Sequence, residues 1–164
     1  MKRPGRRYKV MMLRRAFVAL LLVAAFPARA QDREVPYWAS LRVDEVNMRV
    51  GPSESYPIEW VYHRAMLPVK VVRLYQGWRR VRDQDGAEGW IVARLLNPQR
   101  SAVVVGQGLA AMRAEGSAAA ALRWNLQPGV VGKLGDCDAG WCELGVGAHK
   151  GWVEQRRLWG AGDP

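Results

Sequence analysis

Two cysteines and two histidines are the side chains of this sequence best suited to act as nucleophiles or metal ligands. Cys137 and Cys142 flank a four-residue turn, whereas His63 and His149 lie in different halves of the chain. A cysteine hydrolase needs an ionisable thiol with an activating histidine beside it. A serine hydrolase needs a serine in a recognisable nucleophile turn, and the sequence has none. We therefore expect no catalytic residues, no enzyme activity and no cofactor.

Two interpretations of the cysteine pair are open. In the first, Cys137 and Cys142 form a disulfide, as two cysteines in an exported protein usually do. In the second, they hold a metal ion with His149 as a third ligand. Structural zinc takes four ligands, commonly with a second cysteine pair, and no second pair exists here. The disulfide is therefore favoured, no metal site is predicted, and closing so small a loop stabilises the fold by about 2 kcal/mol.

The orientation of Trp78 carries the binding hypothesis. Along a strand, successive side chains point to opposite faces, so Trp78 and Val81 take opposite sides. If Val81 belongs to the core, Trp78 faces outward, and the same reasoning applies to Trp141. The alternative is that both tryptophans are buried between two domains or cover the ends of the cores.

An outward Trp78 beside Arg49, Tyr56 and Tyr62 forms a predicted aromatic groove. Aromatic faces stack on sugar rings and peptide planes, and arginine pairs with carboxylates in a bidentate manner. These four residues are the candidate ligand-binding set. The tryptophans at matching positions in the two halves of the chain are interpreted instead as structural: Trp60, Trp90, Trp124 and Trp152.

The first thirty residues have the three parts of a secretion signal. A basic start without acidic residues precedes an apolar run at 16–26, and Ala28-Arg29-Ala30 fits the small-x-small cleavage pattern. Eleven apolar residues are too few for a bilayer span, which needs about 20. We predict cleavage after Ala30, the alternative being a retained N-terminal anchor. Arg14-Arg15 loosely resembles a twin-arginine signal, so the export route stays open between that pathway and the general one.

Removal of residues 1–30 changes the meaning of the charge. The whole chain has a net charge of +10, but the first thirty residues hold eight Lys/Arg and no Asp/Glu, which leaves +2 for the rest. A nucleic-acid footprint needs basic residues clustered on a folded domain. We therefore expect no nucleic-acid partner, no stable membrane span after cleavage, and a periplasmic or secreted location.

The remaining chain contains an internal repeat, in which two similar copies are offset by about 63 residues. The matching landmarks are Met48-Arg49 with Met112-Arg113, Trp60 with Trp124, Gly77-Trp78 with Gly140-Trp141, Gly89-Trp90 with Gly151-Trp152, and Arg94-Leu95-Leu96 with Arg156-Arg157-Leu158. Two copies are too few for a solenoid, so they indicate two compact domains. We place them at 37–97 and 101–160. The short joint between them predicts contact between the two domains, each of which is small enough to be marginal alone.

Each domain is expected to be a small five-stranded β-barrel. In the first, strands are predicted at 46–50, 59–62, 69–75, 78–82 and 89–92, followed by one helical turn at 93–96. Asp85-Gly86 is a strong signal for a tight turn.

The segment 46–53 (VNMRVGPS), with Tyr56-Pro57 after it, resembles the opening signature of bacterial Src-homology-3-like domains. The later Gly77-Trp78, Asp85-Gly86 and Gly89-Trp90 follow that pattern in order. The second copy is degenerate, with Glu115-Gly116-Ser117 in place of Gly51-Pro52-Ser53. The pair resembles a family of exported proteobacterial double-barrel proteins. The expected fold is therefore all-β, with two tandem five-stranded barrels after a cleaved signal peptide.

The resemblance implies binding in the cell envelope, because domains of this type commonly accompany cell-wall enzymes and contact peptidoglycan. The expected function is a non-catalytic envelope-binding module with peptidoglycan as its partner. The alternative is a periplasmic adaptor that docks a partner peptide or an envelope enzyme. The second barrel, which lacks the Gly-Pro-Ser turn, is expected to serve as a scaffold.

Overall fold

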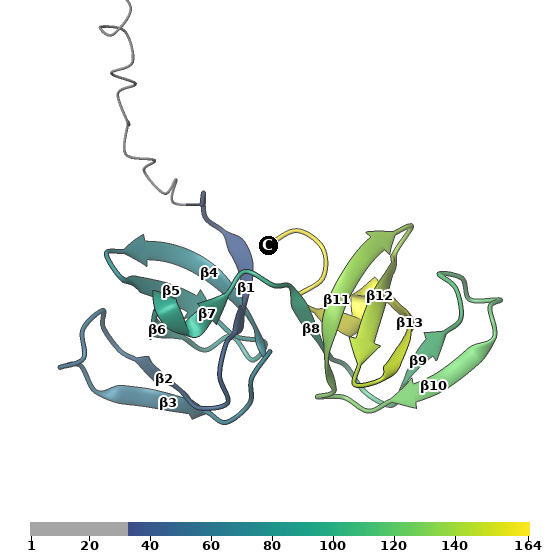
Figure 1. Cartoon of the computed structure of the whole chain (residues 1–164), viewed down its shortest axis with the longest axis horizontal. Helices are drawn as coiled ribbons and strands as arrows, with labels where there is room; N and C mark the ends of the chain where they lie inside the picture. Colours follow the sequence, from purple (N-terminus) through teal and green to yellow (C-terminus); the bar gives the residue numbers. More distant parts are fainter. Residues whose placement is uncertain (1–32) are drawn as a thin grey trace, which may run out of the picture. The chain divides into compact units, whose positions relative to one another are not determined.

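The structure is a computed structural model in which residues 33–164 are described (Figure 1). The predicted signal at 1–30 and its cleavage site after Ala30 lie outside the described residues. Residues 33–164 are all-β apart from two three-residue 3-10 helices. Within this part of the chain, no helix has the length and apolar character needed to cross a bilayer.

The first domain is a seven-stranded antiparallel sheet with the strand order β3-β2-β6-β5-β4-β1-β7. Its strands are β1 (Tyr37–Leu41), β2 (Val46–Arg49), β3 (Ile58–Tyr62), β4 (Pro68–Tyr75), β5 (Trp78–Arg82), β6 (Glu88–Val92) and β7 (Leu96–Asn97). The 3-10 helix η1 (Ala93–Leu95) joins β6 to β7, where the sequence predicts a helical turn.

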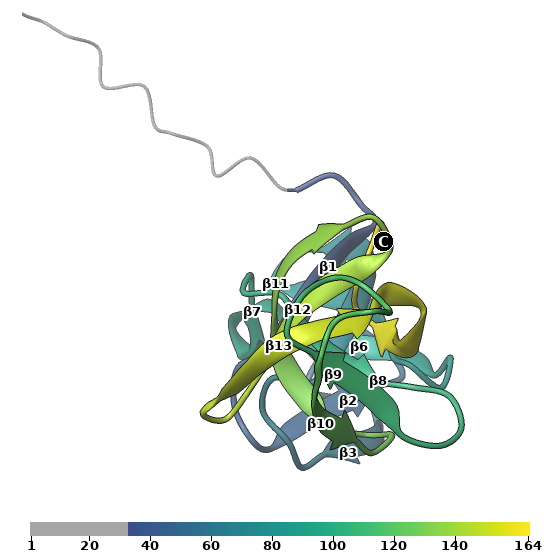
Figure 2. The same cartoon turned by 90° about the vertical axis from the view of Figure 1, so that its right-hand side faces the viewer.

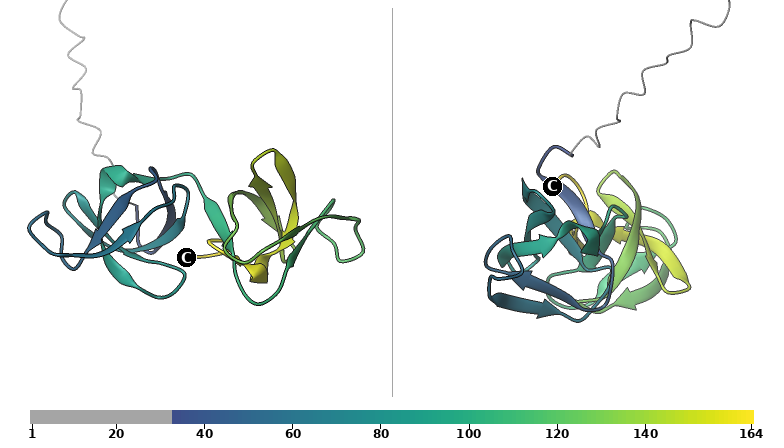
Figure 3. Two further views of the ribbon diagram at one scale, coloured as in Figure 1. Left: turned by 90° about the horizontal axis from the view of Figure 1, so that it is seen from below. Right: turned by 60° about the vertical axis from the view of Figure 1, so that its left-hand side comes forward.

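The second domain repeats this arrangement with the order β10-β9-β13-β12-β11-β8-β14 (Figure 2). Its strands are β8 (Ser101–Val104), β9 (Ala110–Arg113), β10 (Leu122–Leu126), β11 (Val131–Asp138), β12 (Trp141–Val146), β13 (His149–Glu154) and β14 (Leu158–Trp159), with η2 (Gln155–Arg157) before β14. The two copies share one topology, which confirms the repeat read from the sequence. Figure 3 follows the strands of both sheets from two further sides.

The five expected strands of the first domain correspond to β2–β6, and the sheet gains two more. β1 pairs with β4 on one side and with the two-residue strand β7 on the other. A strand of two residues is too short to show a two-residue period in the sequence. β7 is therefore recognised only in the structure, by its pairing with β1. β8 and β14 play the same roles in the second domain.

Each sheet encloses its own apolar core. The first core is built from ten buried residues: Ala39, Leu41, Val46, Met48, Tyr62, Val69, Val71, Val81, Ile91 and Leu96. The second is built from Ala102, Val104, Ala110, Met112, Leu126, Leu134, Cys142, Leu144, Val153 and Leu158. Met48 and Met112 are both completely buried at equivalent positions. A Cβ at Gly89 or Gly151 would collide with the methionine of its own domain, so these two glycines allow β6 and β13 to pass the cores.

Cys137 and Cys142 form a disulfide. They lie directly opposite each other on β11 and β12, with Cys142 in the second core. The metal interpretation fails among the described residues, because neither cysteine has a free thiol.

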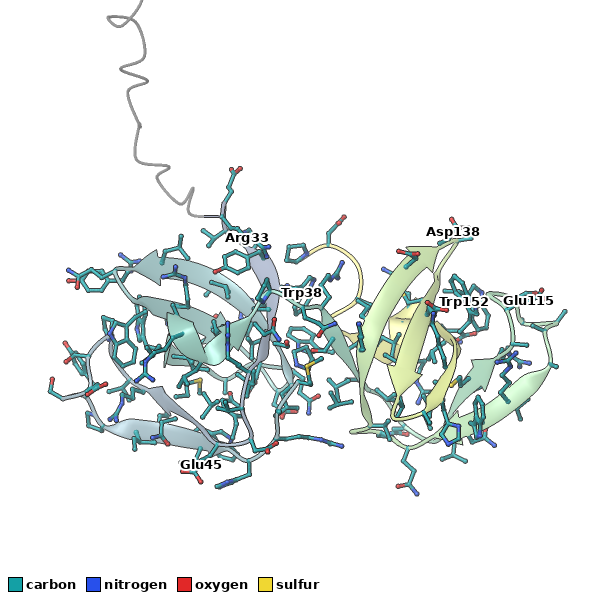
Figure 4. The ribbon with its side chains drawn as sticks, in the orientation of Figure 1. Arg33, Trp38, Glu45, Glu115, Asp138 and Trp152 are labelled. Atoms are coloured by element: carbon teal, nitrogen blue, oxygen red, sulfur yellow. A yellow bond between two sulfur atoms is a disulfide. The ribbon has the colours of Figure 1, made fainter. Side chains whose placement is uncertain are left out.

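The two domains contact each other through side chains as well as through the short link after β7. The rings of Trp38 and Trp159 meet edge to face with centroids 5.0 Å apart, and Lys70 Nζ lies over both, at 5.0 Å and 5.5 Å. Trp38 Nε1 also donates to the Gly162 carbonyl at 3.1 Å. Figure 4 labels Trp38, which lies where the ribbons of the two sheets approach each other. Trp38 and Trp159, rather than Trp78 and Trp141, are therefore the tryptophans at the domain contact.

Candidate binding surface

Arg49 holds the loop that follows β2. Its Nη1 donates to the Tyr56 carbonyl at 2.7 Å, and Val50 N donates to the Pro57 carbonyl at 3.2 Å. In the second domain, Arg113 Nη1 donates to the Ala120 carbonyl, also at 2.7 Å. One N–H group of the arginine predicted to pair with a ligand thus closes a loop, and the equivalent arginine does the same in the second domain.

The degenerate loop of the second domain keeps the backbone of the first. Ser53 N donates to the Gly51 carbonyl at 3.0 Å, and Ser117 N donates to the Glu115 carbonyl at 2.8 Å. Loss of the Gly-Pro-Ser sequence therefore does not change the shape of the loop. In the second domain the loop lies close to the barrel, because a Cβ at Gly116 would be 3.2 Å from the Trp152 ring.

Tyr56 is exposed and lies against the loop glycine. A Cβ at Gly51 would fall 2.6 Å from three carbons of the Tyr56 ring, so a side chain there would displace the ring. The structure therefore brings Tyr56 and Arg49 together, as the groove prediction requires. Ala120 takes the place of Tyr56 in the second domain, which leaves that loop without the ring.

Trp78 lies on the outer side of β5, while Val81 is completely buried in the core. Arg49 is paired with Trp90, and Trp90 is paired with Arg80 on the neighbouring strand. Since strand side chains alternate, Arg49, Trp90, Arg80 and Trp78 share the outer face. Trp78 itself is half-buried on that face.

Tyr62 does not belong to the predicted groove. It is 7% exposed and lies in the first core, because its position in β3 pairs with the inward-facing Val46. Its hydroxyl donates to Asp83 Oδ2 at 2.8 Å. Burial, and then this hydrogen bond, raise the pKa of the Tyr62 phenol above its ordinary value. The groove prediction was therefore wrong for Tyr62, which orients Asp83 from the inside of the barrel.

The position of Trp60 differs from its predicted structural role more than that of any other tryptophan predicted to be structural. Its interpretation as structural is contradicted by a 58% exposed side chain, and Trp124 at the matching position is 37% exposed. Trp90, by contrast, is buried as expected. β3 and β10 each lie at a sheet edge with one paired neighbour. Strand alternation alone does not reveal this exposure, because it places Trp60 on the same side as the buried Tyr62.

Trp60 borders a hollow of about 150 Å³. Its wall includes Trp60, Pro68 and the loop residues Asp83, Gln84 and Asp85, which together we name the Trp60 groove. Asp83 shapes that loop, because its Oδ1 accepts hydrogen bonds from Asp85 N at 3.0 Å and Ala87 N at 2.9 Å.

The Trp60 groove combines an indole face with carboxylate groups. Such a surface can stack on a flat sugar or peptide group and accept hydrogen bonds from its N–H and O–H groups. The second domain lacks an equivalent, because Leu126 replaces Tyr62 and the hairpin between β12 and β13 is shorter. Trp124 instead lies against His149, with ring centroids 4.4 Å apart.

Neither histidine meets a nucleophile in the described part of the chain. His63 Nδ1 lies 3.9 Å from Glu45 Oε2 on an exposed surface, and His149 contacts Trp124. Within residues 33–164, no group of three or more His, Cys, Asp or Glu side chains is placed to hold a metal ion.

A family model described as a bacterial SH3 domain matches the chain twice, over residues 42–98 and 106–160. No curated protein matches it. Similar solved structures include NlpC2 from Trichomonas vaginalis, with 14% identity and a TM-score of 0.35 over 77% of this chain and 49% of that one. An NlpC/P60 family protein from Bacillus cereus ATCC 10987 has 13% identity and a TM-score of 0.35 over 75% of this chain and 56% of its own. The chain spans about half the length of these structures.

Proposed function

Because this chain belongs to the bacterial SH3 domain family, we propose that it is a non-catalytic binding module of the cell envelope that contacts peptidoglycan through the Trp60 groove. The observation that carries the proposal is the 58% exposure of Trp60. A large aromatic side chain left in water at the rim of a hollow is typical of a surface that a ligand covers.

The chemistry of the groove suits a glycopeptide. The exposed face of Trp60 offers a stacking surface for a sugar ring or a peptide plane. Asp85, which also lines the groove, offers an exposed carboxylate to amines and hydroxyl groups. Peptidoglycan presents sugar rings, peptide planes and amines together. The Cys137–Cys142 disulfide supports a location outside the cytoplasm, because such bonds persist in oxidising compartments.

A second candidate function is docking of an extended peptide from an envelope protein. Its support is β3, which lies at the edge of the first sheet and, within residues 33–164, pairs only with β2. Ile58 and Trp60 are both exposed along this strand. An edge strand with unpaired backbone groups can accept a further strand from a partner.

Cosedimentation with purified sacculi tests the proposal. We expect the wild-type protein to sediment with the sacculi and Trp60→Ala to bind about threefold to tenfold more weakly, since an aromatic stacking contact contributes about 1 kcal/mol. Trp60→Ala should keep the wild-type melting temperature, because the side chain is largely in solvent. Trp124→Ala is the matched control, since it removes the equivalent indole of the second domain and should leave binding unchanged.

The other outcomes separate the alternatives. If Trp78→Ala abolishes sedimentation while Trp60→Ala does not, the ligand lies on the outer face of β5 and the groove assignment is wrong. If the wild-type protein does not sediment with sacculi but binds an envelope protein through β3, the adaptor function is supported in place of wall binding. Release of soluble fragments from the sacculi by the pure protein would refute the non-catalytic assignment.

A further inference from the structure

The outer faces of the two barrels carry the same cross-strand ion pair with its charges exchanged. In the first domain, Arg80 on β5 lies 3.1 Å from Glu88 on β6. In the second, the equivalent positions hold Glu143 on β12 and Lys150 on β13, 2.7 Å apart. The strand pairings that define these positions are matched in the two sheets.

In the first domain a third charged side chain, that of Arg82, joins this ion pair, and the second domain lacks its equivalent. Arg82 Nε donates to Glu88 Oε1 at 2.6 Å, so its side chain lies along β6. The equivalent residue is Gly145, since Arg82 pairs with Lys70 and Gly145 pairs with Lys133. Where the arginine side chain would lie, there is a hollow of about 400 Å³. The residues used below are Lys133, Glu143, Gly145, Gly147, His149 and Lys150, which we name the Gly145 hollow.

The fold does not require a glycine at position 145. Its φ is not among the positive values of the chain. A Cβ there would meet only Lys133, at the ordinary contact distances of 3.8 and 4.0 Å. By contrast, a Cβ at Gly132 would lie 2.7 Å from the Gly145 carbonyl oxygen. A glycine inside a strand weakens the strand and often marks a place where a ligand approaches the backbone.

The charge around the hollow is positive and one lysine is uncompensated. The ammonium of Lys150 is paired with Glu143. Lys133 is exposed, and within residues 33–164 its ammonium makes no ion pair or hydrogen bond. Its equivalent in the first domain, Lys70, lies instead over Trp38 and Trp159. One unpaired ammonium beside the accessible backbone of Gly145 is suited to a ligand group with a single negative charge.

We infer that the Gly145 hollow binds the carboxylate of a small ligand, such as the end of a peptide, with Lys133 as its charged partner. The hollow falls within the size range of small-molecule sites, about 300–1,000 Å³. This assigns a binding role to the second domain, which the sequence suggests is only a scaffold. The inference does not depend on the Trp60 groove or on peptidoglycan as the ligand.

A titration followed by two-dimensional amide NMR tests it. The probes are N-acetyl-alanyl-alanine, which carries one carboxylate, and the same dipeptide with a C-terminal amide. We expect the acid, at millimolar concentration, to shift the amide signals of Lys133, Gly145 and Gly147, and the amide probe to leave them unchanged. Equal shifts from both probes, or no shift from the acid at tens of millimolar, would overturn the inference.

Three variants locate the site. Gly145→Arg restores the side chain of the first domain and should abolish the shifts. Lys133→Ala should weaken binding at least about threefold, and it carries the test if Gly145→Arg does not fold. Arg73→Ala is the control, because it removes an exposed cation from β4, the strand equivalent to β11. Retained binding in Lys133→Ala, or an equal loss in Arg73→Ala, counts against the site.

A final arm distinguishes carboxylate from other anions. Inorganic phosphate at the same concentration and pH should shift these amides less than the dipeptide acid, because the hollow offers one uncompensated cation. If phosphate shifts them more strongly, the hollow attracts anions in general and the assignment to a carboxylate fails.

Discussion

The hydroxyl of Tyr62 donates a hydrogen bond to Oδ2 of Asp83 across 2.8 Å, from inside the first core to the loop between β5 and β6. The other carboxylate oxygen of Asp83 accepts two backbone N–H groups of the same loop. A buried side chain thus holds one wall of the Trp60 groove. Tyr62, predicted to bind ligand beside Trp78, instead lines the Trp60 groove and positions its loop.

Tyr62→Phe is expected to lower stability at neutral pH and to remove part of the alkaline sensitivity. Loss of the hydrogen bond to Asp83 should cost about 1 kcal/mol. The pKa of Tyr62 is raised in the fold from its ordinary 10.0, so above pH 10 the unfolded chain loses a proton that the folded chain keeps. Stability then falls by up to about 1.4 kcal/mol per pH unit. Urea unfolding at pH 7, 10 and 11 measures this, and parallel declines in wild type and variant would contradict it.

Replacing the loop arginines should loosen both loops to a similar degree. Arg49→Ala and Arg113→Ala each remove a hydrogen bond from a charged donor to a loop carbonyl, so each should destabilise its domain by about 1 kcal/mol. Hydrogen exchange of the Val50 and Ala114 amides, whose carbonyl partners lie across the loops, reports the change. Loss of sacculus binding in Arg49→Ala with unchanged amide protection would instead show that Arg49 contacts the ligand directly.

Removal of the disulfide should affect the second domain. The double variant Cys137→Ala with Cys142→Ala is expected to lose about 2 kcal/mol, the amount that the chain-entropy model assigns to so short a loop. Urea unfolding with and without a reductant measures it. The reductant should destabilise the wild type and leave the double variant unchanged, and an effect on both would mean that it acts elsewhere.

Gly160→Ala should disturb the contact between the domains. Gly160 has a φ of +101°, and a Cβ there would meet the Ser101 carbonyl and lie 2.9 Å from the Pro68 Cβ of the first domain. Gly86→Ala is the matched control, since Gly86 has a φ of +87° with open space around it. Gly86→Ala should cost about 1 kcal/mol through backbone strain alone.

The steric clash should make Gly160→Ala cost about 2 kcal/mol more, in the range of overpacked sites. Thermal unfolding of both variants measures the difference. Equal losses would show that the region around Pro68 yields to the added methyl group at no cost.

The amino-acid sequence by itself determined the repeat, the all-β class and the central strands, because these rest on local signals. Val81 lies between Arg80 and Arg82 in a clear alternation, and Asp85-Gly86 marks its turn without help from the rest of the chain. The disulfide between Cys137 and Cys142 is favoured over a metal site because the chain has no second cysteine pair. The outward orientation of Trp78 follows from the two-residue alternation of a strand when Val81 belongs to the core.

Only the tertiary structure decided which side chains are covered, because burial depends on segments far away in the chain. Trp60 and Tyr62 share one side of β3, yet Tyr62 lies in the core and Trp60 extends beyond it at the sheet edge. Trp38 and Trp159 meet across 121 positions of sequence, and no local pattern marks them as partners. The Gly145 hollow likewise exists because neighbouring strands place Lys133 and Lys150 around a position with no side chain.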